Sequence, residues 1–509
     1  AGVFPEKYMK KNAVVTVIPE LRYGNGEVAQ GPPATFQGEK VLGNDQAISY
    51  RLGGRYTMKT AFDFVPDMQK SDMYMTFQAK VGKKMVNIPE VKVATGVIST
   101  SELYKHTVLS DGGCFAPDAF QRVTQQKHEA NIKFLVNQAN IRKSELQSNS
   151  VKDFVDMLKQ INADRERLNI QNVEIQAYAS PEGGYDFNNR LSEKRQNVTE
   201  DYVSSQLKAT KINTGIDAHY TAQDWEGFKQ LVAVSNIQDK DVIIRVLDMY
   251  KDPEEREQQI RNMSAGFQEL ATGILPELRR ARMIINYETI GRSDEEILNQ
   301  YNSDAAKLNV EELLYAATLV ENNDDKVGIY KKTTEIYPSD ARAFNNLASM
   351  AMINGNVDQA RQYLTQSLRV NSNQAEALAN RGLLSLINGD LSAAEADIAK
   401  ATTFGDVKYA QGVLNIAKGN YAAAESDFKG MNTNSTALAQ ILNKNYATAV
   451  GTLDDATFKG AMNTYLHAIA AARRDNKYAA NSYLKEALEQ DPSLAPYAEK
   501  DLELAITRK

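Results

Sequence analysis

A repeated turn in the C-terminal part of the chain most constrains how this sequence can fold. The runs N-G-N-V-D-Q-A from Asn354, N-G-D-L-S-A-A from Asn388 and K-G-N-Y-A-A-A from Lys418 share a pattern, and their glycines are 34 and 30 residues apart. Each turn separates two alanine-rich segments with apolar residues at helical spacing. Two weaker copies, K-N-Y-A-T-A and D-N-K-Y-A-A, follow. A unit of this length predicts stacked helix pairs, each burying its apolar face against the next.

This period resembles that of tetratricopeptide repeats, so we predict an all-α solenoid of about five repeats over residues 304–509. Such a solenoid has a concave groove lined by the first helix of each pair, and these grooves receive a peptide or helix of a partner. Paired polar side chains on first helices can clamp an extended backbone; the alternative is that they are solvated residues without a role. The candidate partner-binding residues here are Asn345, Asn346, Asn380 and Arg381.

The stretch from Val173 to Val198 is the most informative about function. Apolar alternation in V-E-I-Q-A-Y predicts a strand, the following S-P-E-G-G predicts a loop, and a helical pattern opens near Asn188. A helix start offers unpaired backbone N–H groups and the positive end of the helix dipole. With Arg195 nearby, such a loop and helix start can hold a carboxylate.

The run N-x-x-L-S-x-x-R, formed by Asn188, Leu191, Ser192 and Arg195, resembles the OmpA/MotB-type C-terminal domain, which grips the peptide stem of peptidoglycan. The resemblance covers residues 123–290 and implies a small α/β domain. It also implies a loop aspartate that pairs with the diaminopimelate amine while the helix arginine takes the acid.

Ser180 stands at the position of that aspartate and carries no charge, so Glu182 is the residue that can supply the missing ionic partner. The alternative for Arg195 is a solvated helix residue paired with Glu193 or Asp186. The candidate peptidoglycan-binding residues are Ser180, Glu182, Asn188 and Arg195.

Between the last two strands of this domain lies a helical insertion at about 222–275, which resembles inserts in OmpA-like proteins of the Bacteroidetes envelope. It holds Trp225, the one tryptophan of the chain. A tryptophan in an amphipathic helix is most often a core residue, and the insertion is also a candidate partner surface.

The first 108 residues alternate with period two and are rich in β-branched and aromatic residues, which predicts an antiparallel β-sandwich of immunoglobulin-like type. Residues 109–122 carry glycine and proline and are predicted to be a linker. Cys114, the single cysteine, excludes an internal disulfide and is expected to be an inert thiol in that linker.

Composition excludes several classes of protein. The formal net charge is -6 and the basic residues are scattered, which argues against nucleic-acid binding. No run of eighteen apolar residues occurs, so any membrane attachment is expected through a partner or a lipid anchor. The sequence starts at Ala1 without a methionine, which fits removal of a secretory leader or an arbitrary start point.

No catalytic or metal-binding pattern is present in the sequence. The four histidines, His106, His128, His219 and His467, lie at no metal-ligand spacing, and no P-loop, nucleophile elbow or dinucleotide fingerprint occurs. We therefore predict a protein that is not an enzyme and has no cofactor.

Together these patterns predict a multidomain envelope protein, a lipoprotein or partner-bound chain on the periplasmic side of the outer membrane rather than on the cell surface. Its predicted function is that of a scaffold or accessory subunit, with the repeats binding an outer-membrane or periplasmic protein and the middle domain facing the cell wall. The alternative is a peptidoglycan tether that uses the OmpA-like site.

Overall fold

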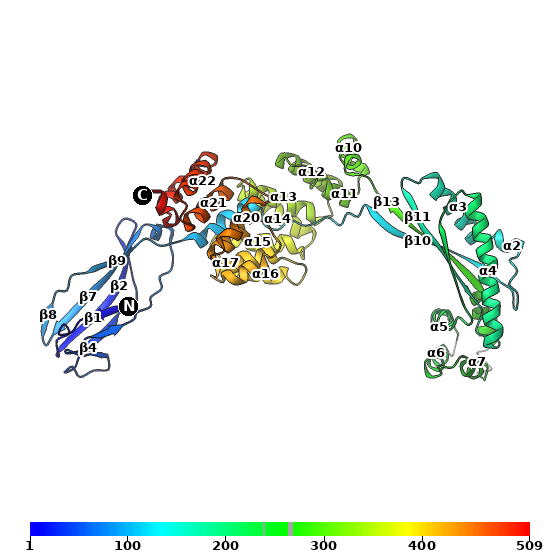
Figure 1. Cartoon of the computed structure of the whole chain (residues 1–509), viewed down its shortest axis with the longest axis horizontal. Helices are drawn as coiled ribbons and strands as arrows, with labels where there is room; N and C mark the ends of the chain where they lie inside the picture. The colour runs from blue at the N-terminus through cyan, green and yellow to red at the C-terminus, as the bar shows by residue number, and fades with distance from the viewer. Residues whose placement is uncertain (238–239, 263–267, 509) are drawn as a thin grey trace. The chain divides into compact units, whose positions relative to one another are not determined.

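The computed structural model describes residues 1–237, 240–262 and 268–508 (Figure 1). The chain forms two compact units. Unit 1 combines Ala1–Asp118 with Leu308–Lys509, and unit 2 is Ala119–Lys307. The N-terminal residues therefore belong to the same compact unit as the C-terminal helices, and the middle of the chain forms a unit of its own.

A seven-stranded sheet forms the N-terminal part of unit 1, in the order β5-β4-β2-β7-β8 with β3 beside β2 and β9 beside β7. All of its pairs are antiparallel except β4 with β5. A two-stranded sheet, β1 with β6, lies over it through Phe4 and Tyr56, whose rings contact Phe36. The strands are β1 (Gly2–Phe4), β2 (Ala13–Tyr23), β3 (Glu27–Gln30), β4 (Ala34–Gly38), β5 (Gln46–Ile48), β6 (Gly54–Tyr56), β7 (Ser71–Val81), β8 (Lys84–Val86) and β9 (Val91–Thr95).

The prediction of a sheet-rich N-terminal region is confirmed, with two differences. The second layer is a two-stranded sheet, so the two layers are unequal. The last strand ends at Thr95, and the 3-10 helix Thr100–Leu103 and α1 (Tyr104–Asp111) follow it. The predicted domain end at residue 108 is therefore wrong, because residues 100–111 are helical and pack on the C-terminal helices.

The C-terminal part of unit 1 is all-helical. Its helices are α11 (Val310–Ala316), α12 (Asn323–Ile336), α13 (Ala341–Ile353), α14 (Val357–Val370), α15 (Ala375–Ile387), α16 (Leu391–Ala401), α17 (Lys408–Ala417), α18 (Tyr421–Asp427), α19 (Asn434–Leu442), α20 (Tyr446–Asp454), α21 (Ala461–Arg473), α22 (Lys477–Gln490) and α23 (Ala495–Lys500). The pairs α13–α14, α15–α16, α17–α18, α19–α20 and α21–α22 are in contact, as are successive pairs. The prediction of five repeated helix pairs is confirmed.

The five turns share one backbone conformation although only three of them contain glycine. Gly355, Gly389 and Gly419 have φ of 71°, 82° and 77°, and Lys444 and Asp475 have φ of 68° and 57°. Glycine adopts this left-handed conformation without the steric cost that a side chain brings. The last two repeats keep the turn with Lys444 and Asp475 in place of glycine, so the glycine that marks the pattern in the sequence is missing there.

Helix α1 lies along the first helices of the array. It contacts α13, α15, α17, α19 and α21, and its Tyr104 and Val108 belong to the same buried cluster as the repeats. The predicted linker at 109–122 is therefore wrong in its first part: residues 109–117 are seated on the array and do not form a free connection.

Unit 2 is built on a four-stranded sheet in the order β10-β13-β11-β12, with β11 and β12 parallel and the other pairs antiparallel. Helices α3 and α4 cover one face (Figure 1), where Phe154 and Leu158 of α3 and Val203 of α4 pack on Val173 and Ile175 of β11. The elements are β10 (Val123–Lys133), α2 (Lys143–Leu146), α3 (Asn149–Ala163), β11 (Leu168–Tyr178), α4 (Tyr185–Ala209), β12 (Gly215–Thr221), β13 (Arg280–Ile290) and α10 (Asp294–Asp304).

The predicted alternation of strands and helices in this unit is confirmed, with shifted boundaries. The first strand, β10, begins nine residues before the predicted 132–136 and ends at Lys133, and α4 begins at Tyr185 instead of near Asn188. The insertion forms α5 (Trp225–Val234), α6 (Lys240–Met249), α7 (Pro253–Asn262), a π-helical turn (Leu270–Ile274) and α9 (Leu275–Leu278); residues 238–239 and 263–267 of the predicted insertion lie outside the described residues. Among the described helices, none combines the length and apolar character needed to cross a bilayer.

Candidate functional site

The segment that follows α1, Gly112–Pro117, lies against three asparagines of the repeats. Asn345 and Asn346 are on α13, and Asn380 is the corresponding residue on α15. All three are fully or almost fully buried, with exposed fractions of 0%, 2% and 0%. A buried amide needs partners for its N–H and C=O groups, and here the backbone of the segment supplies them.

Asn380 and Asn346 each form a pair of hydrogen bonds with the backbone of one residue. Asn380 Oδ1 accepts from Cys114 N at 2.7 Å while Asn380 Nδ2 donates to Cys114 O at 2.8 Å. Asn346 binds Ala116 in the same way, with its Oδ1 2.7 Å from Ala116 N and its Nδ2 2.9 Å from Ala116 O. Asn345 Nδ2 adds a further donor to Cys114 O at 2.9 Å. We call these three residues the asparagine clamp.

The clamp leaves no room for a side chain at Gly113. This glycine has φ of 70°, and a Cβ built there would lie 2.3 Å from Asn380 Oδ1. Gly112, with φ of 76°, is packed against Ile353 and the carbonyl of Ser349. The Gly-Gly pair therefore lets the backbone turn out of α1 and approach the amides closely.

Asp111 ties the end of α1 to a later repeat. Its two carboxylate oxygens accept from the backbone N–H groups of Asn434 and Ser435, both at 2.9 Å, at the start of α19. The Tyr409 hydroxyl donates to Asp111 Oδ2 at 2.9 Å. Burial raises the pKa of Asp111, and the same burial strengthens these bonds to a helix start.

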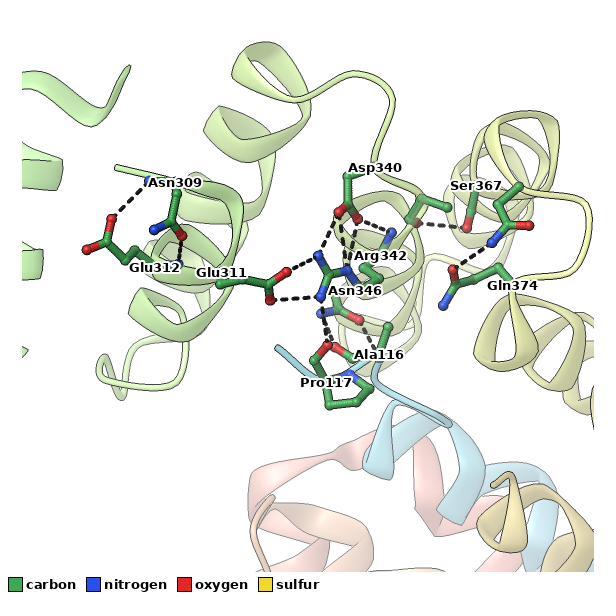
Figure 2. Close-up of polar contacts among 12 residues, drawn as sticks. Ala116, Pro117, Asn309, Glu311, Glu312, Asp340, Arg342, Asn346, Ser367 and Gln374 are labelled. Carbon is green, nitrogen blue, oxygen red and sulfur yellow. Dashed lines mark hydrogen bonds and ion pairs between the residues drawn. The ribbon is translucent and has the colours of Figure 1, made fainter. Parts of the chain in front are cut away.

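Arg342 fastens the other end of the segment (Figure 2). Its guanidinium makes paired hydrogen bonds to Glu311 of α11, at 2.7 and 2.9 Å, and contacts Asp340, which caps α13. The same guanidinium donates to Pro117 O at 3.4 Å. The arginine thus links α11 and the segment to the first helix of the clamp.

The structure accounts for the four predicted groove residues in two ways. It brings the clamp asparagines onto main-chain N–H and C=O groups, but that backbone belongs to the same chain and not to a partner. Arg381 points elsewhere and pairs with Asp397 of α16 through two bonds of 2.6 and 2.7 Å. Binding of a separate partner by these residues stays a prediction.

The polar side chains of the loop between β11 and α4 form hydrogen bonds within the chain. Ser180 Oγ donates to Glu182 Oε1 at 2.9 Å, and Arg279 donates to the same oxygen at 2.8 Å. Asn188, which is 2% exposed, donates to the carbonyls of Ser180, Glu182 and Gly183 at 3.0–3.2 Å. The loop acid is therefore paired with an arginine of the chain, and Asn188 holds the loop shape.

Arg195 is buried, with an exposed fraction of 1%, and lies over the Phe134 ring. It donates to the carbonyls of Gln138, Tyr178 and Leu135 at 3.0, 2.8 and 3.1 Å. Burial, together with the nearby Arg279, lowers the pKa of Arg195 to about 10. The expectation of a solvated Arg195 paired with Glu193 or Asp186 is wrong, because its guanidinium is committed to main-chain carbonyls.

Residues of the insertion form hydrogen bonds with this loop. Glu257 of α7 accepts from Gly183 N at 2.8 Å, and Gln223 donates to Gly183 O at 3.0 Å. Trp225 packs in the buried cluster of the insertion against Phe228, and its Nε1 donates to Gln223 Oε1 at 3.0 Å. Trp225 is thus half-buried, with part of its ring in the core of the insertion.

Within the residues that the structure describes, no group of three His, Cys, Asp or Glu side chains could hold a metal ion. Cys114 is buried and burial raises the pKa of its thiol to about 12. The thiol is therefore protonated at neutral pH, which fits the expectation of an inert cysteine.

The fold and the clamp define a multidomain chain with a sheet-rich N-terminal region and an all-helical, repeat-built C-terminal region. The family described as Tetratricopeptide repeat matches residues 341–374, which contain α13 and α14. The chain therefore contains a tetratricopeptide repeat, at the pair that carries Asn345 and Asn346.

No curated protein matches the chain. Among solved structures it is similar to a tetratricopeptide repeat protein from Parabacteroides merdae, at 16% identity over 50% of this chain and 100% of that chain, with a TM-score of 0.29. It is also similar to Pseudomonas aeruginosa pilF, at 19% identity over 41% and 98% of the two chains and a TM-score of 0.25. A third is YrrB, described as a TPR protein with an unusual peptide-binding site, at 16% identity, 41% and 100% coverage and a TM-score of 0.22.

Proposed function

We propose that this protein is a non-enzymatic scaffold or accessory subunit of an outer-membrane assembly, on the periplasmic side of the cell envelope, whose tetratricopeptide array binds a protein partner. The observation that carries the proposal is the array itself. Its helix pairs form one continuous buried cluster with α1, so a large surface is ordered before any partner arrives. A preordered surface binds without the entropic cost of ordering it.

We further propose that the partner binds outside the face that α1 occupies. Removing α1 would expose Tyr104 and Val108, which are buried in the array, and would leave Asp111 without its three donors. Each buried group left unpaired costs about 1–3 kcal/mol, so a partner peptide would have to replace all of these contacts to enter. The remaining surfaces of the helix pairs offer binding without that cost.

The alternative, a peptidoglycan tether, draws support from the order of strands and helices in unit 2, which is an α/β layer as the resemblance implies. The candidate residues of its site give less support. Arg195 is occupied by three carbonyls and Glu182 by Arg279, so a stem peptide would have to displace contacts within the chain. We therefore place the tether second.

Cross-linking of the full chain in envelope extracts, with the linked residues mapped by mass spectrometry, tests the scaffold. We expect a partner linked to residues between 308 and 508, captured equally by the wild type and by Asn346→Ala, which loosens the clamp. Higher capture by Asn346→Ala would place the partner in the α1 face, and no partner linked to this region would reject the scaffold. For the tether, retention on purified sacculi that free diaminopimelate abolishes would favour it, and absence of retention would reject it.

A further inference from the structure

The sheet of unit 2 carries a groove on the face opposite α3 and α4. Its floor consists of alternate residues of two neighbouring strands, among them Gln176 and Tyr178 of β11 and Arg280 and Arg282 of β13, and its wall is the start of α5. The groove has a volume of about 480 Å³. This is within the range of small-molecule sites in proteins.

The groove is lined by charges of both signs, the carboxylates of Glu174, Asp224 and Glu226 beside the guanidinium groups of Arg280 and Arg282. Arg282 makes a two-point contact with Glu129, at 2.7 and 2.8 Å, and Arg280 Nη2 lies 3.3 Å from Asp224 Oδ2. An anion would have to compete with these carboxylates for the guanidinium groups. The groove therefore does not select an anion.

Its hydrogen-bonding groups suit a ligand that both donates and accepts. The amides of Gln176 and Gln230, the Tyr178 phenol and the Asp224 carboxylate line the groove together with Arg280. The two amides make exposed hydrogen bonds, Gln176 Nε2 to Thr221 Oγ1 at 3.0 Å and Gln230 Nε2 to Glu226 Oε1 at 3.1 Å, which a ligand hydroxyl can replace. In addition, the Nε of Arg280 is buried and has no hydrogen-bond partner in the described structure. A hydroxyl group donates and accepts at once, so a ligand with several hydroxyls matches this mixed lining.

An aromatic ring borders the same groove. Trp225 lines it, and the ring is held in place by the hydrogen bond to Gln223 and by edge-on packing against Phe228, with centroids 5.7 Å apart. A fixed aromatic surface beside planar polar groups offers apolar contact to the C–H face of a sugar ring while the polar groups meet its hydroxyls.

We infer that the groove between the open sheet face and α5 is a binding site for a neutral oligosaccharide. Gln176 and Gln230 bind hydroxyls from two sides, Arg280 donates to a third, and Trp225 contacts the ring. This site lies on the opposite side of β11 from the helix layer that holds Arg195, and it does not depend on the proposed partner of the repeats.

Trp225 is the one tryptophan of the chain, so intrinsic fluorescence of the full-length protein reports on the groove directly. The probes are chitotetraose, maltotetraose, cellotetraose and inorganic phosphate. We expect a saturable change in emission with at least one tetrasaccharide and none with phosphate. Gln230→Ala and Gln176→Ala should each weaken that binding about tenfold, the effect of one lost hydrogen bond.

Gln230 is exposed, so its replacement leaves the fold intact, and Gln126→Ala, on the exposed part of β10, is the matched control that should bind as the wild type does. No emission change with any of the three tetrasaccharides at millimolar concentration would overturn the inference. A response to phosphate alone, or equal affinities of the wild type and both groove variants, would overturn it as well.

Discussion

The asparagine clamp predicts a specific loss of stability when Asn380 is replaced by alanine. Asn380→Ala removes the acceptor of Cys114 N–H and leaves this donor buried without a partner, which costs about 1–3 kcal/mol. The Cys114 carbonyl is less affected, because it keeps Asn345 Nδ2 at 2.9 Å and Ser349 Oγ at 3.3 Å. The small void left by the amide adds to the loss. We expect the free energy of unfolding of unit 1 to fall by about 2–3 kcal/mol.

Urea denaturation of the full chain followed by far-UV circular dichroism reports the helices of both units, and Trp225 fluorescence identifies the transition that belongs to unit 2. Separate probes are needed because a chain of two units need not unfold in one step. Hydrogen exchange of a peptide covering residues 110–118 gives a local readout, since the Cys114 amide is a bonded proton. Asn380→Ala should speed its exchange and leave the Trp225 transition unchanged.

Asn388→Ala is the matched control, because Asn388 is an exposed asparagine directly after the end of α15, the helix that carries Asn380. Its replacement should change the free energy of unfolding by no more than about 0.5 kcal/mol. The reasoning fails if the two variants are equally stable. It also fails if the 110–118 amides of the wild type exchange as fast as those of an unstructured peptide.

Two further predictions concern the buried charges. Arg195→Met should lower the free energy of unfolding of unit 2 by about 2–4 kcal/mol, because three buried carbonyls lose their donor; Trp225 fluorescence measures this change. Arg190→Met, at an exposed position of α4, is the control and should change the free energy of unfolding little. Equal effects of the two substitutions would contradict a structural role for Arg195. For Asp111, whose pKa is raised by burial, the folded state keeps the proton to higher pH than the unfolded state, so stability falls as pH rises from the ordinary aspartate pKa to the raised one. Asp111→Asn should lack this fall, and parallel pH profiles of wild type and variant would exclude it.

Most of the helical array could be predicted from local sequence patterns. The glycines at 355, 389 and 419 marked three turns, and asparagines beside Lys444 and Asp475 were enough to mark the other two, since all five adopt the same left-handed backbone. Period and turn chemistry are properties of short segments, so a single sequence reveals them. The same holds for the strands and helices of unit 2, whose boundaries shifted by a few residues.

The packing of α1 and of residues 112–117 against the repeats could not be predicted from local patterns. Cys114 meets Asn380 across 266 residues of sequence, and Ala116 meets Asn346 across 230. The polar pair at Asn345 and Asn346 indicated a peptide backbone as its ligand, because an amide matches a peptide group. That a partner supplies such a backbone stays a prediction. Nothing local to either segment shows that the ligand is part of the same chain. Arg342 and Asp111 were missed for the same reason.

Arg195 shows how one residue type supports two opposite readings. An arginine near a helix start can receive a ligand acid or can satisfy the chain's own carbonyls, and the sequence around it is the same in both cases. The carbonyls of Leu135 and Gln138, about sixty residues earlier, decide between them here. In both units, then, groups with the right chemistry for a partner bind the chain itself. It follows that surfaces outside these contacts, the outer faces of the repeats and the open face of the unit 2 sheet, are where binding to other molecules should be sought.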